Sequence, residues 1–304
     1  MKCVKINKKY AEKVKNELID LKALSKDYKP VTDKEHIYFP IDKEVKKYDI
    51  IEKECPKKEK ENVEISSFDS IGDIIIIAED APDSVAEQLI KKKNIKVVLR
   101  KKGIHHGEFR TQDVEWVAGE KRKETIYMEN GVRIKLNVET SYFSPRLSTE
   151  RKRIADLVQD GEKVLVLFSG VAPYPLTIAK HAKPKLVVGV EKNKEANGYA
   201  IFNCRKYKNI ELYNKDAKNF EYKEKFDRIL MPLPKSSEDF LNVALKLIKK
   251  GGIIHFYDFI EEKNIPEESI NKIKKHIKDF EVIEVVKCGQ YAPRKYRICI
   301  DFRV

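Results

Sequence analysis

The chain has 304 residues, of which 41% are hydrophobic, so it is long and apolar enough for two or three globular domains. Its 62 Lys and Arg outnumber 49 Asp and Glu, and the net charge of +13 favours a polyanionic partner, although faces that merely solvate the protein give the same balance. Five cysteines without a CxxC pair argue against a zinc site or a disulfide framework. No run of residues resembles a signal peptide or a membrane span. We therefore expect a cytoplasmic, monomeric protein without a membrane partner.

The N-terminal half is predicted to hold two small α+β units. In the first, over 1–54, the strand KCVKI precedes a helix over 9–24 and the strand HIYFPI. A charged stretch without apolar periodicity, 55–67, is interpreted as a linker. The second unit, over 68–137, is predicted to contain the buried strand IGDIIIIAED, the helix SVAEQLIKKK, the strand KVVLR and the hairpin ETIYMENGVRIKLNV, whose turn is Asn130-Gly131.

From about residue 150 onward strands and helices alternate, which is typical of a mostly parallel sheet. The predicted strands are VLVLFS, KLVVGVE, IELYNKD, FDRILMP and IIHFYDF. Helices are predicted over TIAKHA, over 193–206, from Ser236 or Ser237 to Gly251-Gly252, and over 266–280. Two final strands, EVIEVVKC and YRICIDFR, form an antiparallel edge. We therefore predict the α/β class, with a doubly wound, Rossmann-like sheet over 138–304 that resembles the class I methyltransferases.

Polar and glycine positions stand where these strands end, and ligands of open α/β sheets bind at the carboxyl ends of the strands. Gly170 follows the first strand, where its backbone can approach a ligand, although an ordinary turn has the same composition. Glu191 follows the second strand, where a carboxylate accepts hydrogen bonds from ribose hydroxyls, and Asp216 follows the third, where it can bind an adenine amino group. Ala172 and Pro173 interrupt the Gly-x-Gly-x-x-Gly pattern of a dehydrogenase.

Several stretches together are typical of one family: GEFR (107–110), VAGE (117–120), ENGVRIKLNV, YFSPRLSTERKRI (142–154), YDF (257–259) and YAPRKYRICIDF. They resemble the archaeal tRNA (guanine-37, N1)-methyltransferase family. The resemblance covers 68–304 well and the N-terminal unit loosely. It implies S-adenosylmethionine as cofactor, tRNA as partner and methyl transfer to N1 of guanine-37. The loop FSGVAPYPL and the motif PLPK resemble an archaeal branch that also methylates carbon 7 of the tricyclic wyosine precursor.

The resemblance also implies the roles of individual residues. Arg110 would stabilise negative charge on guanine O6, and Glu150, in a partly desolvated pocket, would remove the N1 proton. Tyr142 would flank the cofactor or the flipped base. The cofactor would be bound by Phe168, Gly170, Val171, Glu191, Asp216, Pro232 and Pro234, and the tRNA by Arg146 and Lys235. Without the resemblance, Arg110 would be a surface arginine, and Glu150 would pair with Arg151 or Arg153 in an exposed ion pair.

Two other functions stay open at the level of sequence. Pro232 stands where the family has Asn, and Asn137 where it has Asp. Pro232 and the altered first loop are compatible with a non-catalytic tRNA-binding relative. Transfer of the aminocarboxypropyl group of the same cofactor is the other alternative, against which Arg110 and Glu150 argue, because that chemistry needs no deprotonation of guanine N1.

Basic runs and a histidine pair have plain alternatives as well. The runs 91–93, 100–102 and 151–153 would contact phosphates in an RNA enzyme, and would otherwise be solvated faces. His105-His106 is expected in an ordinary loop, because no partner cluster at metal-ligand spacing accompanies it.

Overall fold

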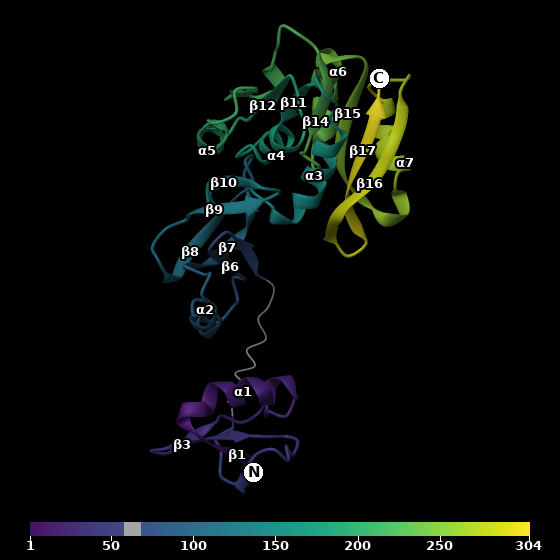
Figure 1. The fold of residues 1–304 in the computed structure, drawn as a ribbon. Helices are drawn as coiled ribbons and strands as arrows, with labels where there is room; N and C mark the ends of the chain where they lie inside the picture. Colours follow the sequence, from purple (N-terminus) through teal and green to yellow (C-terminus); the bar gives the residue numbers. More distant parts are fainter. Residues whose placement is uncertain (58–67) are drawn as a thin grey trace. The chain divides into compact units, whose positions relative to one another are not determined.

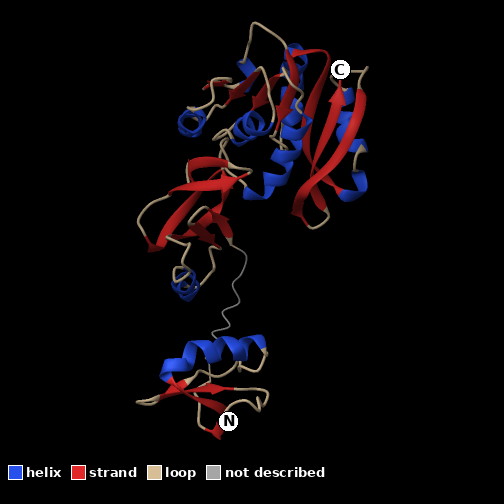
Figure 2. Cartoon of the chain, viewed as in Figure 1, coloured by secondary structure: helices blue, strands red, loops and turns tan. Residues whose placement is uncertain are grey.

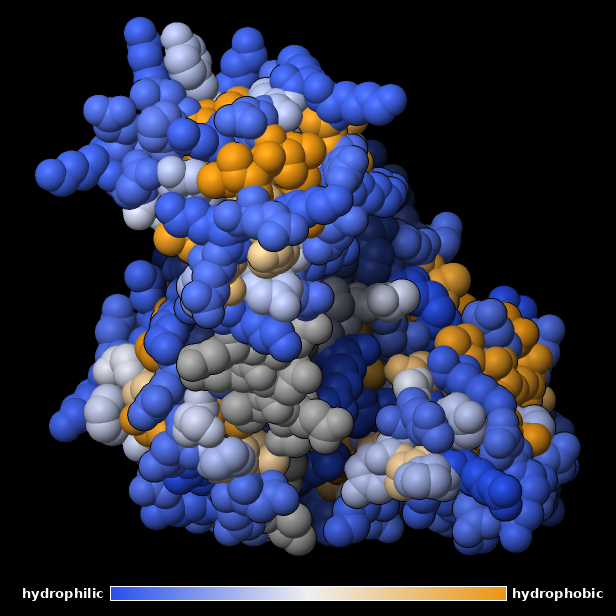
Figure 3. Space-filling view, turned by 90° about the horizontal axis from the view of Figure 1, so that it is seen from below, coloured by the Kyte–Doolittle hydropathy of each residue, from blue (hydrophilic) through white to orange (hydrophobic). Residues whose placement is uncertain are grey.

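The structure is a computed structural model that describes residues 1–57 and 68–304. Contacts divide the chain into two compact units, Met1–Glu64 and Ile65–Val304, so the predicted segments 68–137 and 138–304 fall within one unit. Most of the predicted linker, 55–67, lies outside the described residues. Charged and polar side chains cover most of the face drawn in Figure 3. Within the described ranges, no helix is both long and apolar enough to cross a membrane.

The N-terminal unit is an antiparallel sheet with one α-helix. Its strands follow the order β2-β3-β1-β4, with bounds Val31–Thr32, His36–Pro40, Lys2–Asn7 and Ile50–Glu52. A short 3-10 helix, Lys8–Tyr10, leads into α1, Ala11–Asp20, whose Val14 and Leu18 pack on Val4 and Phe39. The predicted helix over 9–24 is wrong at its C-terminal end, because Lys22 adopts the left-handed conformation (φ +52°) that ends helices.

The second unit begins with the sheet β5-β6-β7-β8, whose strands are Asp69–Ile71, Ile74–Ile77, Val97–His106 and Thr111–Gly119. Helix α2, Asp83–Leu89, connects β6 to β7. The strand predicted within IGDIIIIAED is confirmed as β6, and the short β5, which was not predicted, precedes it across a turn at Gly72 (φ +61°). A Cβ at Gly72 would lie 2.3 Å from Thr125 Oγ1, so only glycine fits this turn.

The hairpin β9-β10, Glu124–Glu129 and Val132–Asn137, is confirmed with its turn at Asn130-Gly131. It joins the two parts of the second unit. Ile134 and Leu136 of β10 share one hydrophobic cluster with Leu99 of the first sheet and Leu176 of the following domain. This shared cluster explains why 65–304 is a single compact unit.

The remaining strands form a seven-stranded sheet in the order β13-β12-β11-β14-β15-β17-β16 (Figure 1). Their bounds, in that order, are Ile210–Tyr213, Leu186–Val190, Lys163–Leu167, Phe226–Met231, Ile248–Glu261, Lys295–Arg303 and Glu281–Ala292. The first five are parallel, and β17 and β16 add an antiparallel edge, so the predicted doubly wound sheet is confirmed.

Helices cover both faces of this sheet (Figure 2). Val164 and Val166 of β11 belong to a cluster with side chains of α3 (Ser148–Leu157) and α4 (Pro173–His181). The alternate residues, Leu165 and Leu167, belong to a cluster with side chains of α6 (Leu241–Leu247) and α7 (Glu267–Lys274). This alternation is what a strand buried on both faces requires. Helix α5, Lys194–Cys204, follows β12 and packs on β10.

The helix predicted from Ser236 or Ser237 to Gly251-Gly252 is wrong at both ends. A 3-10 turn, Ser237–Phe240, precedes α6, and β15 already begins at Ile248. Neither serine caps α6, because Phe240 holds its N-cap position; Ser236 makes no capping side-chain bond, and Ser237 Oγ donates to the carbonyls of Met231 (3.0 Å) and Leu233 (2.8 Å). The two glycines lie inside β15, where a Cβ at Gly252 would meet Ile248 Cγ1 at 2.7 Å.

Candidate active site

The carboxyl ends of β11, β12, β13, β14 and β15 open on one cavity of about 1200 Å³. Its walls contain most of the residues that the sequence singled out: Arg110, Tyr142, Phe168, Gly170, Glu191, Asp216, Pro232, Pro234 and Lys235. Sites for one small molecule usually occupy roughly 300–1,000 Å³. The cavity therefore has room for a cofactor together with part of a second ligand.

The loop after β11 has the backbone of a ligand cradle. Phe168, Gly170 and Ala172 adopt left-handed conformations, with φ of +56°, +54° and +67°. A Cβ added to Gly170 would find only the carbonyl of Tyr142, at 3.9 Å, so the space beside this glycine is open. Buried Ser169 Oγ has no hydrogen-bond partner within the described chain. A ligand can thus approach the Gly170 backbone directly.

Glu191 ties this loop to the end of β12. Its Oε2 accepts the Gly170 amide at 2.8 Å, and its Oε1 accepts the Asn193 amide at 2.7 Å. Burial raises the pKa of Glu191 above the usual value, although the two amide donors act in the opposite direction. Each carboxylate oxygen still has an acceptor site, so Glu191 can also bind vicinal hydroxyls.

Asp216 lies after β13 in a network that crosses the cavity mouth. Its Oδ2 is 2.9 Å from Lys192 Nζ, and its Oδ1 accepts the Lys218 amide at 2.9 Å. The hydrogen bond from Lys192, followed by the one from the Lys218 amide, lowers the pKa of Asp216. Lys192 also pairs with Glu108 at 2.6 Å, so the GEFR segment is linked to the strand ends of the large sheet.

Other parts of the wall are formed by the turn between β7 and β8 and by residues 142–144 of the YFSP segment. The Arg110 guanidinium lies 4.7 Å from the centroid of the Tyr142 ring. Arg110 has φ +52° in the turn between β7 and β8, three residues after Gly107 (φ +68°). Beneath this wall, Arg151 forms a buried ion pair with Glu129 and donates to the Ser144 carbonyl at 3.1 Å. That pair fixes the loop that carries Tyr142.

Three predicted residues do not line the cavity. Val171 is fully buried in the core shared with β10 and α5, because the left-handed turns around it direct its side chain inward. Arg146 lies in the wall of a neighbouring smaller cavity, where it pairs with Asp69 at 2.9 Å and stays 77% exposed. Glu150 is buried, with only 5% of its surface exposed.

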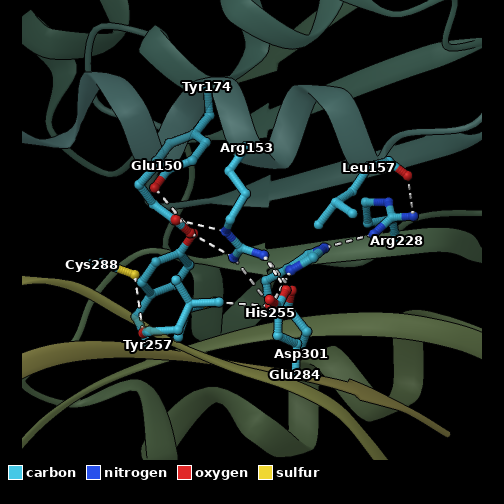
Figure 4. A network of polar contacts seen from close by, with 12 residues as sticks. Glu150, Arg153, Leu157, Tyr174, Arg228, His255, Tyr257, Glu284, Cys288 and Asp301 are labelled. Carbon is cyan, nitrogen blue, oxygen red and sulfur yellow. Dashed lines mark hydrogen bonds and ion pairs between the residues drawn. The ribbon is translucent and has the colours of Figure 1, made fainter.

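Glu150 belongs to a buried polar network (Figure 4). Arg153 binds its two oxygens at 2.8 Å each, and Tyr257 Oη donates to its Oε1 at 2.6 Å. The ion pair with Arg153 that the sequence suggested is therefore present, but it is buried. Tyr257 lines the main cavity and also meets Tyr174 Oη at 3.2 Å. Tyr257 thus connects the cavity to the Glu150 carboxylate, and sequence reasoning missed it.

The same network continues through the core of the sheet. Asp301 pairs with Arg153 (2.6 Å) and with His255 Nδ1 (2.6 Å), and His255 Nε2 meets Arg228 at 2.8 Å. Cys299 adds a third potential metal ligand to His255 and Asp301, a cluster that the sequence did not predict. The guanidinium groups of Arg153 and Arg228 already occupy this cluster and oppose a further cation.

The strand order, with cavity-lining residues at the carboxyl ends of four parallel strands, is that of a class I methyltransferase domain. Small α+β domains precede it in the chain. Comparisons identify the family. The TRM5/TYW2 methyltransferase domain matches 125–286, the tRNA methyltransferase 5 N-terminal domain matches 3–49, and the TYW2 N-terminal domain matches 48–122. The chain belongs to the TRM5/TYW2 methyltransferase family.

Relatives resemble the chain over different lengths. The tRNA (guanine(37)-N(1))-methyltransferase Trm5b of Pyrococcus abyssi is 36% identical, over 99% of this chain and 98% of its own. A solved complex of aTrm5 with tRNALeu has a TM-score of 0.79 and 30% identity, covering 99% of each chain. Methanocaldococcus jannaschii TYW2 in complex with AdoMet has a TM-score of 0.63 and 27% identity, covering 78% of this chain and 99% of its own.

Proposed function

We propose that this protein transfers the methyl group of S-adenosylmethionine to N1 of guanine-37 in tRNA. The observation that carries the proposal is that Glu191 and Asp216 line the same cavity as Arg110 and Tyr142. The first pair suits a nucleoside cofactor, and the second suits a nucleobase. The full-length match to Trm5b supports the same activity. The five free cysteines fit an enzyme of the reducing cytoplasm.

The residues at the strand ends fit S-adenosylmethionine. Glu191 would accept hydrogen bonds from the ribose hydroxyls, and Asp216 would bind the adenine amino group. The open space beside Gly170 leaves room for the cofactor. Pro232 and Pro234 line the part of the cavity where the reacting groups would meet. When bound, the cofactor supplies a methyl group activated by a sulfonium. The protein's part is to align that group with the acceptor nitrogen.

Guanine N1 carries a proton and becomes nucleophilic only when it is lost. We place Arg110 where O6 gains negative charge, with its guanidinium held against the Tyr142 ring. Glu150 takes the N1 proton through Tyr257, because Tyr257 stands between the cavity and the carboxylate. As the N1–H bond breaks, Tyr257 Oη would accept that proton and pass its own to Glu150. The N1 electron pair would then be free for the methyl group, whose bond to the sulfonium sulfur breaks with its electrons left on the sulfur as a neutral thioether. Burial raises the pKa of Tyr257 well above the usual value, so the hydroxyl stays protonated at rest.

Basic side chains line the same cavity and suit an RNA substrate. Lys101, Lys192, Lys215, Lys218, Lys235 and Lys272 all contribute to its walls. We assign Lys235, beside Pro234, to a phosphate of the tRNA. The match of 3–49 to the tRNA methyltransferase 5 N-terminal domain supports the Trm5-type activity.

Incorporation of labelled methyl groups into two tRNA transcripts that differ only at nucleotide 37 tests the proposal. The transcript with guanine should be methylated and the one with adenine should not. Equal labelling of both transcripts, or of neither, would refute it. Tyr257→Phe tests the proton path in the same assay, because phenylalanine keeps the ring but removes the hydroxyl. Its single-turnover rate should fall by roughly 10²–10⁴, as for loss of a general base, with Tyr48→Phe as a control outside the cavity.

A further inference from the structure

A second cavity of about 300 Å³ adjoins the main one and shares part of its wall. One side is formed by the sheet β5-β6-β7-β8 and by residues 138–147. The other is formed by the end of the β16-β17 hairpin together with Phe259 of β15. Arg110 and Tyr142, which we place against the target base, line both cavities, as do Tyr291 and Arg297. A ligand in the second cavity would therefore lie next to a base in the first.

The shared wall carries two pairs of aromatic and arginine side chains. Arg110 faces Tyr142 at 4.7 Å, and Arg297 lies 5.2 Å from the centroid of Phe259. Tyr291 packs on Phe259 with ring centroids 4.1 Å apart, yet 56% of its surface stays exposed. Aromatic rings and guanidinium planes are the surfaces on which unpaired bases stack. The exposed part of Tyr291 leaves surface for such a contact.

Charge in the second cavity also favours a nucleotide. Its lining includes Arg110, Arg146 and Arg297, and the carboxylate present is Asp69. Asp69 is already neutralised by Lys101 at 2.7 Å and Arg146 at 2.9 Å. Arg297 Nε is buried without a hydrogen-bond partner among the described residues. An RNA phosphate or a base edge would supply the acceptor that this nitrogen lacks.

We propose that the second cavity binds the base next to guanine-37 in the tRNA strand, with Tyr291 as its stacking surface. The inference rests on the proposed function, since it takes the main cavity as the place of the target base. Stacking does not depend on the identity of the base, so the subsite serves tRNAs with different neighbours of guanine-37. It holds the strand on one side of the flipped nucleotide.

Binding of tRNA to Tyr291→Ala and Tyr291→Phe, measured without turnover, tests the subsite. Base stacking on an aromatic side chain contributes about 1–3 kcal/mol, so Tyr291→Ala should weaken tRNA binding roughly 5–150-fold. Tyr291→Phe should bind like the wild type, and so should Phe202→Ala, an exposed aromatic on α5 outside both cavities. Cofactor affinity of Tyr291→Ala should be unchanged. Wild-type tRNA affinity in Tyr291→Ala would overturn the proposal.

Transcripts that lack one base, either just before or just after guanine-37, make the test specific. One of these abasic transcripts should bind the wild type as weakly as intact tRNA binds Tyr291→Ala. For that transcript, Tyr291→Ala should not lower the affinity any further. If Tyr291→Ala weakens both abasic transcripts as much as intact tRNA, no neighbouring base stacks there and the subsite is refuted. Because binding is measured, this failure is distinct from that of the proposed function, which would show as absence of methylated guanine-37 with the wild-type protein.

Discussion

Replacement of Glu191 by alanine tests the cofactor site where the structure gives the clearest magnitude. The Glu191 carboxylate holds the Gly170 and Asn193 amides at 2.8 and 2.7 Å and keeps acceptor sites for the ribose hydroxyls. Glu191→Ala removes those acceptors. Unpaired polar groups of this kind cost about 1–3 kcal/mol, so cofactor affinity should fall roughly 5–150-fold.

Isothermal titration of the whole protein with S-adenosylmethionine measures this loss. Glu195→Ala is the matched control, because Glu195 is exposed at the start of α5 and does not line the cavity. Thermal unfolding without cofactor shows whether the loops beside Glu191 survive the change. Burial raises the pKa of Glu191 above 4.5. The affinity of the wild type for the cofactor should therefore fall as acidification protonates Glu191, beginning at a pH above 4.5. Glu191→Gln should not show this fall in affinity with pH. Unchanged affinity in a folded Glu191→Ala protein would refute the assignment.

Other perturbations have equally definite outcomes. Glu150→Gln and Arg110→Ala should each lower the single-turnover methylation rate, the former by roughly 10²–10⁴, while calorimetry shows intact cofactor binding; wild-type rates in both would remove them from the mechanism. The affinity for tRNA should fall with rising salt, with a log–log slope near −0.7 to −0.9 per phosphate contact, and a flat filter-binding response would exclude phosphate contacts. Asp301→Asn should cost about 3–5 kcal/mol of unfolding free energy in denaturant titrations at neutral pH, because it breaks a buried ion pair. Burial alone would raise the pKa of Asp301, but the hydrogen bonds and charges of His255 and Arg153 outweigh it and lower the pKa overall. The difference in unfolding free energy between the wild type and Asp301→Asn should therefore shrink as the pH falls below about 3.8. A difference that does not change with pH would contradict this reasoning.

The cofactor end of the site could be predicted because its geometry follows from strand order. Gly170, Glu191 and Asp216 each follow a parallel strand, and parallel strands bring their carboxyl ends to one edge of the sheet. The side chain of Val171 does not reach the cavity, because being next to Gly170 in the sequence does not fix the direction of a side chain. The left-handed residues on either side of Val171 direct it into the core.

The other end of the site depends on contacts between residues distant in the sequence. Arg151 lies in a run of three basic residues that suggests a surface, yet it is buried against Glu129, 22 positions away. Tyr257 lies in a strand that was predicted, but its contact with Glu150 joins residues 107 positions apart. Strand β8 escaped prediction because Gln112, a buried polar residue, interrupts the alternation of apolar and polar positions.

Mass spectrometry of nuclease digests of a tRNA transcript, taken after incubation with the wild-type protein and S-adenosylmethionine, tests the central claim most directly. The account predicts that the nucleoside from position 37 gains the mass of one methyl group and co-elutes with N1-methylguanosine. A methyl group on another atom or nucleotide, the larger mass of an aminocarboxypropyl group, or an unmodified tRNA despite bound cofactor would contradict it.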